Sequence, residues 1–325
     1  MSFAFTFPGQ GSQSVGMGQE LSKAYRAARD VFEAVDDALG EKLSDTIWNG
    51  PDTALTLTQN AQPALMAVSL AAFSVLRHEY GAEAIAPAFV AGHSLGEYSA
   101  LAAADVISVG DAARLLRLRG LAMQAAVPAG EGGMLALIGA SLEAAERLAR
   151  AGGSSSGVCQ VANDNAPGQV VISGSKAAIQ RAMELAAEFG IRRAVLLPVS
   201  APFHCALMKP AADRMAEALA NVKFSPPRFP VVANVTAAPV LDVHDIRKFL
   251  VQQVTGVVRW RESISYMIGH GVDTLFEIGA GRVLTGLARR ISNDADARSL
   301  SSPAEVGAFD EWLKVRKEAE QACST

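Results

Sequence analysis

Residues 92–96, with the sequence GHSLG, place a serine between two glycines where a strand pattern gives way to a helix pattern. The apolar run 88–91 before them predicts a short strand, and residues 97–104 after them are rich in helix formers. In this context Gly-x-Ser-x-Gly is typical of a turn that exposes the serine hydroxyl. The positive end of the following helix faces the point where negative charge develops when a carbonyl is attacked. Ser94 is therefore a candidate nucleophile, with an ordinary tight turn as the alternative.

Strand patterns followed by helix patterns recur on both sides of this motif. Strands are predicted at 3–7 and 274–278, and helices at 63–80, 111–126 and 283–291. This alternation favours an α/β fold with a mostly parallel sheet and helices on both faces. The tail predicts a short strand from 299 and a helix from about 303.

The middle of the chain follows a different order. Strands are predicted at 134–138, 158–162, 169–173 and 193–197, with helices at 142–151 and 176–189. Ser141 can cap the first of these helices. The order β-α-β-β-α-β is the ferredoxin-like pattern. We therefore expect a large α/β domain from 1–126 and 198–325, with a small α+β subdomain inserted at 127–197.

Composition excludes several classes of protein. Lys and Arg number 29 against 33 Asp and Glu, and no basic block indicates nucleic-acid binding. The apolar stretch 64–76 is too short to span a bilayer, and residues 1–7 lack the cationic start of a signal peptide. The three cysteines are scattered, and no Cys/His cluster has metal-ligand spacing. We expect a cytoplasmic protein without metal, membrane or nucleic-acid partners.

A serine nucleophile needs a base, and the chain has five histidines. His204 follows the last strand of the predicted subdomain, where α/β proteins often place working groups. It is either the base or an ordinary hydrogen-bonded histidine. His93 adjoins the serine and should point away from the hydroxyl. His78 is expected to be structural on an apolar helix, His244 to lie in an exposed loop, and His270 at a helix end.

Two glycine-rich turns could suggest a nucleotide site. Residues 9–16 (GQGSQSVG) contain the first two glycines of a dinucleotide fingerprint, but the third comes too late and no Walker lysine follows. Residues 279–281 fail the same test. Donation of backbone N–H groups to an oxyanion suits the first turn better than a phosphate cradle.

The predicted helix 111–126 carries Arg114, Arg117 and Arg119. One guanidinium could face a cleft and bind a carboxylate in bidentate fashion. The alternative is a solvated stripe, and the spacing does not show which arginine faces inward.

Seven segments together resemble the malonyl-CoA:acyl-carrier-protein transacylases of type II fatty acid synthesis. They are residues 7–13 (FPGQGSQ), 58–64 (TQNAQPA), 92–97 (GHSLGE), 119–120 (RG), 163–174 (NDNAPGQVVISG), 204–210 (HCALMKP) and 283–287 (VLTGL). The resemblance covers nearly the whole chain. It implies an α/β-hydrolase-like domain with a ferredoxin-like insert, which agrees with the pattern above.

The resemblance also implies roles for single residues. Ser94 would carry the malonyl ester, and His204 would act as its base and then as the acid for the departing thiol. A backbone carbonyl, here that of Gln253, would hold the histidine. The backbone N–H groups of Gln10 and Leu95 would form the oxyanion hole.

Four further positions follow from the same resemblance. Arg119 would bind the malonyl carboxylate, Asn165 would line the cleft for the pantetheine arm, and Arg193 could meet CoA phosphates or the carrier. Phe203 departs from the serine often found there in bacterial housekeeping members. A bulky residue resembles the malonyl-selective acyltransferase domains of polyketide synthases, so Phe203 is expected to narrow the pocket beside the malonyl α-carbon.

The implied partners are malonyl-CoA and, transiently, holo acyl carrier protein, with no permanently bound cofactor. Coenzyme A thioester and the phosphopantetheine of the carrier serve as substrates, and we expect a monomer. Three alternatives remain at this level: a malonyl acyltransferase of a polyketide pathway, a serine thioesterase or esterase, and a non-catalytic docking protein for acyl carriers.

Overall fold

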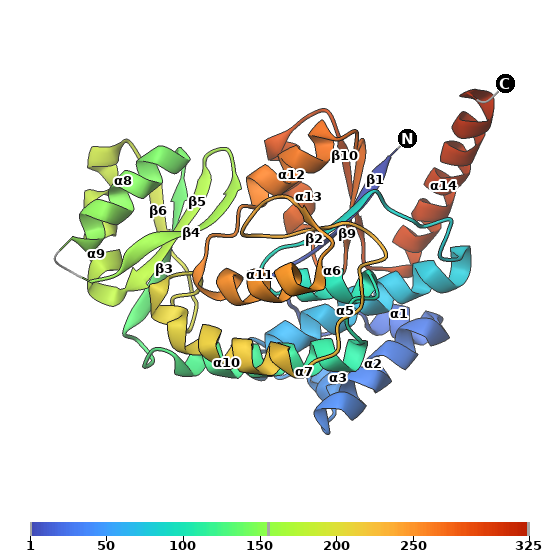
Figure 1. The fold of residues 1–325 in the computed structure, drawn as a ribbon, viewed down its shortest axis with the longest axis horizontal. Coiled ribbons are helices and arrows are strands. Elements are labelled where there is room, and N and C mark those ends of the chain that lie inside the picture. The colour runs from blue at the N-terminus through green and yellow to red at the C-terminus, as the bar shows by residue number, and fades with distance from the viewer. Residues whose placement is uncertain (1, 155–156, 324–325) are drawn as a thin grey trace.

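The computed structural model describes residues 2–154 and 157–323. Its strands form a six-stranded sheet in the order β10-β9-β1-β2-β7-β8 and a four-stranded sheet in the order β4-β5-β3-β6 (Figure 1). The large sheet consists of β1 (Phe3–Phe7), β2 (Phe89–Gly92), β7 (Val231–Val232), β8 (Pro239–Val240), β9 (Thr274–Ile278) and β10 (Asp296–Leu300). The small sheet consists of β3 (Gly132–Ile138), β4 (Cys159–Ala166), β5 (Gln169–Ser175) and β6 (Arg193–Leu196).

The large sheet is mostly parallel, as predicted. β1 pairs in parallel with β2 and β9, β9 with β10, and β2 with β7, whereas β8 pairs antiparallel with β7. Every residue of β1 is buried because helices cover both faces of the sheet. Phe5 of this strand packs edge-on against Phe73 and Phe276, which anchors the aromatic core.

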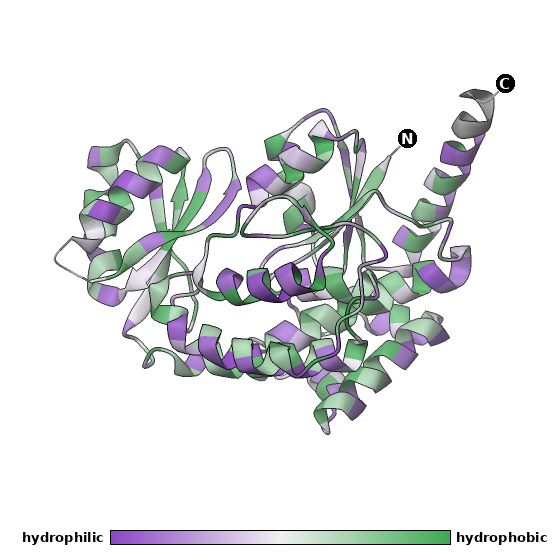
Figure 2. Cartoon of the chain, in the orientation of Figure 1, coloured by the Kyte–Doolittle hydropathy of each residue, from purple (hydrophilic) through white to green (hydrophobic). Residues whose placement is uncertain are grey.

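Twelve of the described α-helices lie outside the stretch that forms the small sheet. They are α1 (Gln19–Ala24), α2 (Arg26–Leu39), α3 (Leu43–Asn49), α4 (Asp52–Leu55), α5 (Thr58–Tyr80), α6 (Gly96–Ala103), α7 (Val109–Ala125), α10 (Lys209–Ala220), α11 (Val243–Thr255), α12 (Trp260–Gly269), α13 (Val283–Ile291) and α14 (Pro303–Cys323). In Figure 2 the central strands are largely hydrophobic, and polar residues alternate along outer helices such as α10 and α11. Among the described helices, none has an apolar run long enough to cross a bilayer.

Several local predictions need correction. α5 begins at Thr58 rather than Pro63, because the Leu57 carbonyl accepts from the N–H groups of Asn60 and Ala61 and starts the helix earlier. His78, expected to be structural, is exposed on that helix, and among the described residues its ring bonds only the neighbouring Glu79. His244 lies in the first turn of α11, since the Asp242 carboxylate caps that helix.

The small sheet has the strand order of a ferredoxin-like fold, as predicted. It is antiparallel, and α8 (Leu142–Gly153) and α9 (Lys176–Leu185) pack against it. α9 ends before the predicted 189 because a 3-10 turn, η1 (Ala186–Phe189), completes that segment. A second 3-10 turn, η2 (Ala206–Met208), precedes α10. All four strands lie within 127–197, while the division of the chain at those residues remains a prediction. Both termini lie far from this sheet (Figure 1).

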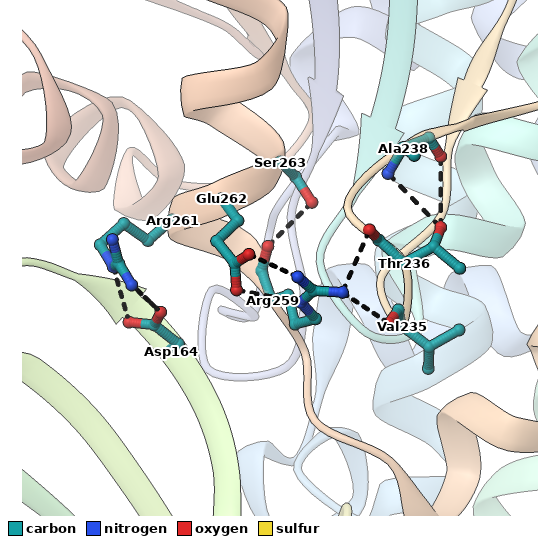
Figure 3. A network of polar contacts seen from close by, with 8 residues as sticks. All are labelled: Asp164, Val235, Thr236, Ala238, Arg259, Arg261, Glu262 and Ser263. Atoms are coloured by element: carbon teal, nitrogen blue, oxygen red, sulfur yellow. Dashed lines mark hydrogen bonds and ion pairs between the residues drawn. The ribbon is translucent and has the colours of Figure 1, made fainter. Parts of the chain in front are cut away.

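A short segment before and at the start of α12 joins the small sheet to the large one (Figure 3). The Asp164 N–H of β4 donates to the Val258 carbonyl at 3.0 Å. Arg261 holds the buried Asp164 carboxylate, with 2.7 Å between Nη2 and Oδ2. On the other side, Arg259 donates its backbone N–H and its guanidinium to carbonyls of residues 234–236, just after β7. Residues 258–261 therefore tie the small sheet to the loop that follows β7 of the large sheet.

Candidate active site

Ser94 lies on a turn that only glycines can flank. β2 ends at Gly92, α6 begins at Gly96, and Ser94 adopts a φ of 54°. A Cβ on Gly92 would meet the Gly96 carbonyl carbon at 1.9 Å, and a Cβ on Gly96 would meet the Phe7 oxygen at 2.3 Å. The predicted strand–turn–helix is therefore formed, with the serine in the left-handed region that side chains rarely occupy.

Ser94 and His204 are brought together from positions far apart in the sequence. Oγ of Ser94 lies 2.7 Å from Nε2 of His204, and Nδ1 of His204 lies 2.8 Å from the Gln253 carbonyl. A carbonyl accepts only, so Nδ1 carries the proton and Nε2 is free to accept one from the serine. Burial and, second to it, the nearby Arg119 charge lower the pKa of His204 to about 3. The histidine is thus held neutral, in the form that a base requires.

This depressed pKa predicts a pH-dependent loss of stability. The folded pKa of His204 is about 3, below the ordinary value of 6.5, so between these values the unfolded chain binds a proton that the folded chain does not. His204 contributes nothing to the pH dependence above 6.5 and destabilises the fold as the pH falls below it, by about 2 kcal/mol at pH 5. Urea unfolding at pH 7 and pH 5 should show a larger loss in the wild type than in His204→Gln. Equal losses in both proteins would contradict this assignment.

The three arginines of α7 have different surroundings. Arg114 is exposed and pairs with Asp111, while Arg117 donates to Asn60 and pairs with Glu41. Arg119 is 1% exposed and lines the cleft beside Ser94. The structure therefore selects the arginine that spacing alone could not select.

Arg119 donates to neutral groups. Nη1 donates to Oε1 of Gln62 at 2.8 Å, and Nη2 donates to Oε1 of Gln253 at 2.9 Å and to Oγ of Ser94 at 3.2 Å. Burial lowers its pKa, since the positive charge has lost its solvation. A buried guanidinium whose hydrogen-bond partners are neutral is suited to an incoming carboxylate.

Two backbone N–H groups at the cleft are available for an oxyanion. Gln10 and Leu95 both line the cavity, and across 2–154 and 157–323 neither N–H donates to a protein acceptor. The Ser94 N–H is committed elsewhere, because it donates to Oδ1 of Asn234 at 2.8 Å. This arrangement supports the predicted pair of donors.

The cavity above Ser94 has a volume of about 420 Å³ and lies between the two sheets. Its walls come from both parts of the chain: Gln10, Gly11, Gln13, Gln62, His93, Ser94, Leu95, Arg119, Met123, Met134, Asn163, Asn165, Val171, Leu197, Pro198, Val199, Phe203 and His204. Oδ1 of Asn165 accepts from Nε2 of His93 at 2.8 Å, so His93 does point away from the serine hydroxyl. Arg193 is exposed at the start of β6 and does not line this cavity, so its predicted phosphate contact gains no support.

Sequence reasoning gave no role to three residues that the structure places at the site. Asn234 bonds the Ser94 N–H, Gln62 bonds Arg119, and Glu97 accepts from Asn234 and Gln253 beneath the turn. Asn234 follows β7, and the carboxyl ends of parallel strands are where α/β proteins place functional groups. That position was the available signal for Asn234.

The fold, the Ser94–His204 pair and the buried Arg119 together define an acyl transferase, and residues 4–304 match the family model described as an acyl transferase domain. A relative from Salmonella typhimurium named malonyl CoA-acyl carrier protein transacylase is 46% identical over 307 residues, which are 94% of this chain and 98% of the relative. The chain belongs to the malonyl CoA-acyl carrier protein transacylase family.

Solved structures agree with this assignment. The crystal structure of an acyl-carrier-protein-S-malonyltransferase from Bartonella henselae is 55% identical, with a TM-score of 0.94 over 97% of this chain and all of that chain (100%). A malonyl-transacylase in complex with a type II PKS acyl-carrier protein is 43% identical, with a TM-score of 0.91 over 94% of this chain and 98% of that one. The mixed fold with its two sheets is thus that of known malonyltransferases.

Proposed function

We propose that this chain transfers malonyl groups from malonyl-CoA to the phosphopantetheine thiol of holo acyl carrier protein, for fatty acid elongation. One observation carries the proposal: Ser94 Oγ lies 2.7 Å from Nε2 of His204 and 3.2 Å from Nη2 of Arg119. A nucleophile, its base and a carboxylate receptor therefore meet at one point of the cleft. This spacing suits an acyl group that bears its own free carboxylate.

The reaction proceeds through a serine ester in two balanced halves. Ser94 Oγ attacks the thioester carbonyl carbon while Nε2 of His204 takes the hydroxyl proton, and the N–H groups of Gln10 and Leu95 donate to the oxyanion. The C–S bond then breaks, and the proton on Nε2 passes to the departing CoA sulfur. The carrier thiol next gives its proton to Nε2 and attacks the ester, and Ser94 leaves with that proton. These protein groups supply the chemistry without a permanently bound cofactor.

The buried guanidinium also accounts for substrate choice. A malonyl carboxylate satisfies Arg119, whereas an acetyl group leaves this buried charge without an anionic partner, and such mispairing is costly. Discrimination against acetyl-CoA should therefore be strong. A simple esterase has no use for this group, which argues against the hydrolase alternative.

A single chain supplies every group named above, so we propose that the monomer is sufficient for activity. Cys159 and Cys205 are free thiols, which is consistent with a reducing cytoplasmic setting. The similarity to a malonyl-transacylase bound to a type II PKS acyl-carrier protein keeps a polyketide carrier as a second candidate acceptor.

The test is intact mass after mixing the protein with equal malonyl-, methylmalonyl- and acetyl-CoA, followed by holo acyl carrier protein. We expect a malonyl adduct that maps to Ser94 and is discharged onto the carrier. Free malonate accumulating without carrier would instead support a hydrolase. Parallel reactions with a fatty-acid carrier and a polyketide carrier would separate the two acceptors by rate.

Phe203 predicts a further selectivity, against a branched α-carbon. Its ring is 8% exposed and lines the cavity beside His204. One methyl group is worth about 1–3 kcal/mol in such a pocket, so Phe203→Ser should raise methylmalonyl loading relative to malonyl by about tenfold or more. Competition loading followed by mass spectrometry measures this ratio, with Phe203→Leu as the control that keeps bulk. An unchanged ratio in Phe203→Ser would count against the role.

A further inference from the structure

A buried carboxyl group lies directly beneath the Ser94 turn and has no part in the steps above. Glu97, near the start of α6, is 3% exposed. Its Oε2 accepts from Nε2 of Gln253 at 2.8 Å and from the Asn234 N–H at 3.1 Å. Asn234 in turn accepts the Ser94 N–H, so this carboxyl is linked to the nucleophile through one residue and to Gln253 directly.

The side chain of Gln253 connects Glu97 to Arg119. Its Nε2 donates to Glu97 and to the Ser94 carbonyl at 2.9 Å, while its Oε1 accepts from Nη2 of Arg119 at 2.9 Å. If the Gln253 carboxamide were rotated by half a turn, its oxygen would face two acceptors, the Glu97 carboxyl and the Ser94 carbonyl. Its NH₂ group would then face the guanidinium of Arg119, which is also a donor. Both ends therefore favour one orientation, because a carboxamide offers donors on one side and an acceptor on the other.

We propose that Glu97 is a positioning residue for acyl selection: it holds the Gln253 carboxamide so that Oε1 faces Arg119 and aims the guanidinium at the substrate's free carboxylate. This inference rests on the proposed malonyl transfer. It assigns Glu97 an effect that depends on the acyl group, because acetyl transfer uses Ser94 and His204 but makes no ion pair with Arg119.

The atom that acts is an acceptor oxygen, and a negative charge is not required. Burial raises the pKa of Glu97 to about 7, so both protonation forms are populated near neutral pH. With the proton on Oε1, Oε2 still accepts from Gln253 and Asn234. Glutamine at position 97 can present its own Oε1 in the same place, whereas alanine and aspartate cannot reach Gln253.

The experiment measures kcat and KM for Ser94 loading with malonyl-CoA and with acetyl-CoA. Glu97→Ala should lower kcat/KM for malonyl-CoA by about tenfold or more, mainly through KM, and lower the malonyl-to-acetyl ratio by a similar factor. Glu97→Gln should stay within about threefold of the wild type. An unchanged ratio in Glu97→Ala, or equal loss of both substrates, overturns the inference.

Two additions keep the test decisive if Glu97→Ala folds poorly. Glu97→Asp retains a buried carboxyl but falls short of Gln253, so it should show the same change in ratio. In a Gln253→Met background, Glu97→Asp should cause no further change in ratio, because the link to Arg119 is already cut. A further drop of about threefold or more there would overturn the proposed route.

Glu277 provides the matched control for a buried glutamate. It is 1% exposed and accepts from the N–H groups of Leu284 and Thr285 at the start of α13. Glu277→Gln should lower the urea midpoint without changing the malonyl-to-acetyl ratio. Wild-type loading and discharge separate the two proposals: if the wild type fails to load malonate, both fall, whereas normal wild-type transfer with an unchanged ratio in the Glu97 variants overturns only the positioning role.

Discussion

Replacing Ser94 by alanine should remove the acyl-enzyme and lower malonyl transfer by about 10⁴-fold or more. The serine oxygen is the atom on which the proposed mechanism stores the malonyl group between two thiols. With only a methyl group facing Nε2 of His204, a carrier thiol would have to meet malonyl-CoA directly in the cleft, without a covalent intermediate.

Intact mass after incubation with malonyl-CoA, and the rate of malonyl-carrier formation, measure this loss. Ser200→Ala is the matched control, because Ser200 is an exposed serine near the cleft that bonds Thr58 at 3.1 Å. It should load and transfer at the wild-type rate. Substantial transfer by a well-folded Ser94→Ala protein would mean that another group carries the acyl chain, or that none does.

Replacing Arg119 by methionine should convert a malonyl-selective site into one that prefers uncharged acyl groups. Malonyl loading should fall by about 10³-fold, because the substrate carboxylate would enter a buried site without a cationic partner. Acetyl loading should hold or rise, since no unpaired guanidinium remains beside the acyl group. The ratio of malonyl to acetyl loading should therefore change by a larger factor than either loading rate alone.

Competition between malonyl-CoA and acetyl-CoA for Ser94 provides the measurement. Arg117→Met is the matched control, because Arg117 lies on the same helix, does not line the cavity, and bonds Asn60 and Glu41. It should leave the ratio unchanged and cost some stability. If Arg119→Met lowers malonyl and acetyl loading by the same factor, Arg119 stabilises the fold and does not select substrates by binding their carboxylate.

Local pattern was sufficient for much of the architecture. β1, β9 and α13 have the predicted bounds, since each is a short apolar run or periodic segment ended by glycine, proline or a polar cap. The start of α5 was predicted wrongly because Pro63 is a common first residue of helices, yet this helix begins at Thr58. A residue such as Pro63 favours the start of a helix, but its presence does not show that the helix starts there.

The candidate site could not be predicted in full from local sequence, because its residues meet through contacts between distant parts of the chain. Ser94 has a local signal, but its bond to Asn234 spans 140 positions, and the bond from Arg119 to Gln62 spans 57. Pattern offered His204 and the three arginines of α7 as candidates, the resemblance chose His204 and Arg119 and added Gln253, and the structure brings these three together. It could not show that the Gln253 side chain, as well as its carbonyl, serves the site, because that requires the packed position of α11.

The segment that binds Asp164 through Arg261 also binds residues 234–236 through Arg259 (Figure 3). Residues 127–197, the predicted subdomain, are therefore not expected to be exchangeable on their own, although they are contiguous in sequence. A chimera that takes 127–197 from a relative without a carboxylate at position 164 would leave Arg261 unpaired, and we expect the change to reach, through the start of α12, the loop that holds the Ser94 N–H. Grafting for new acyl selectivity should transplant residues 258–262 together with the subdomain.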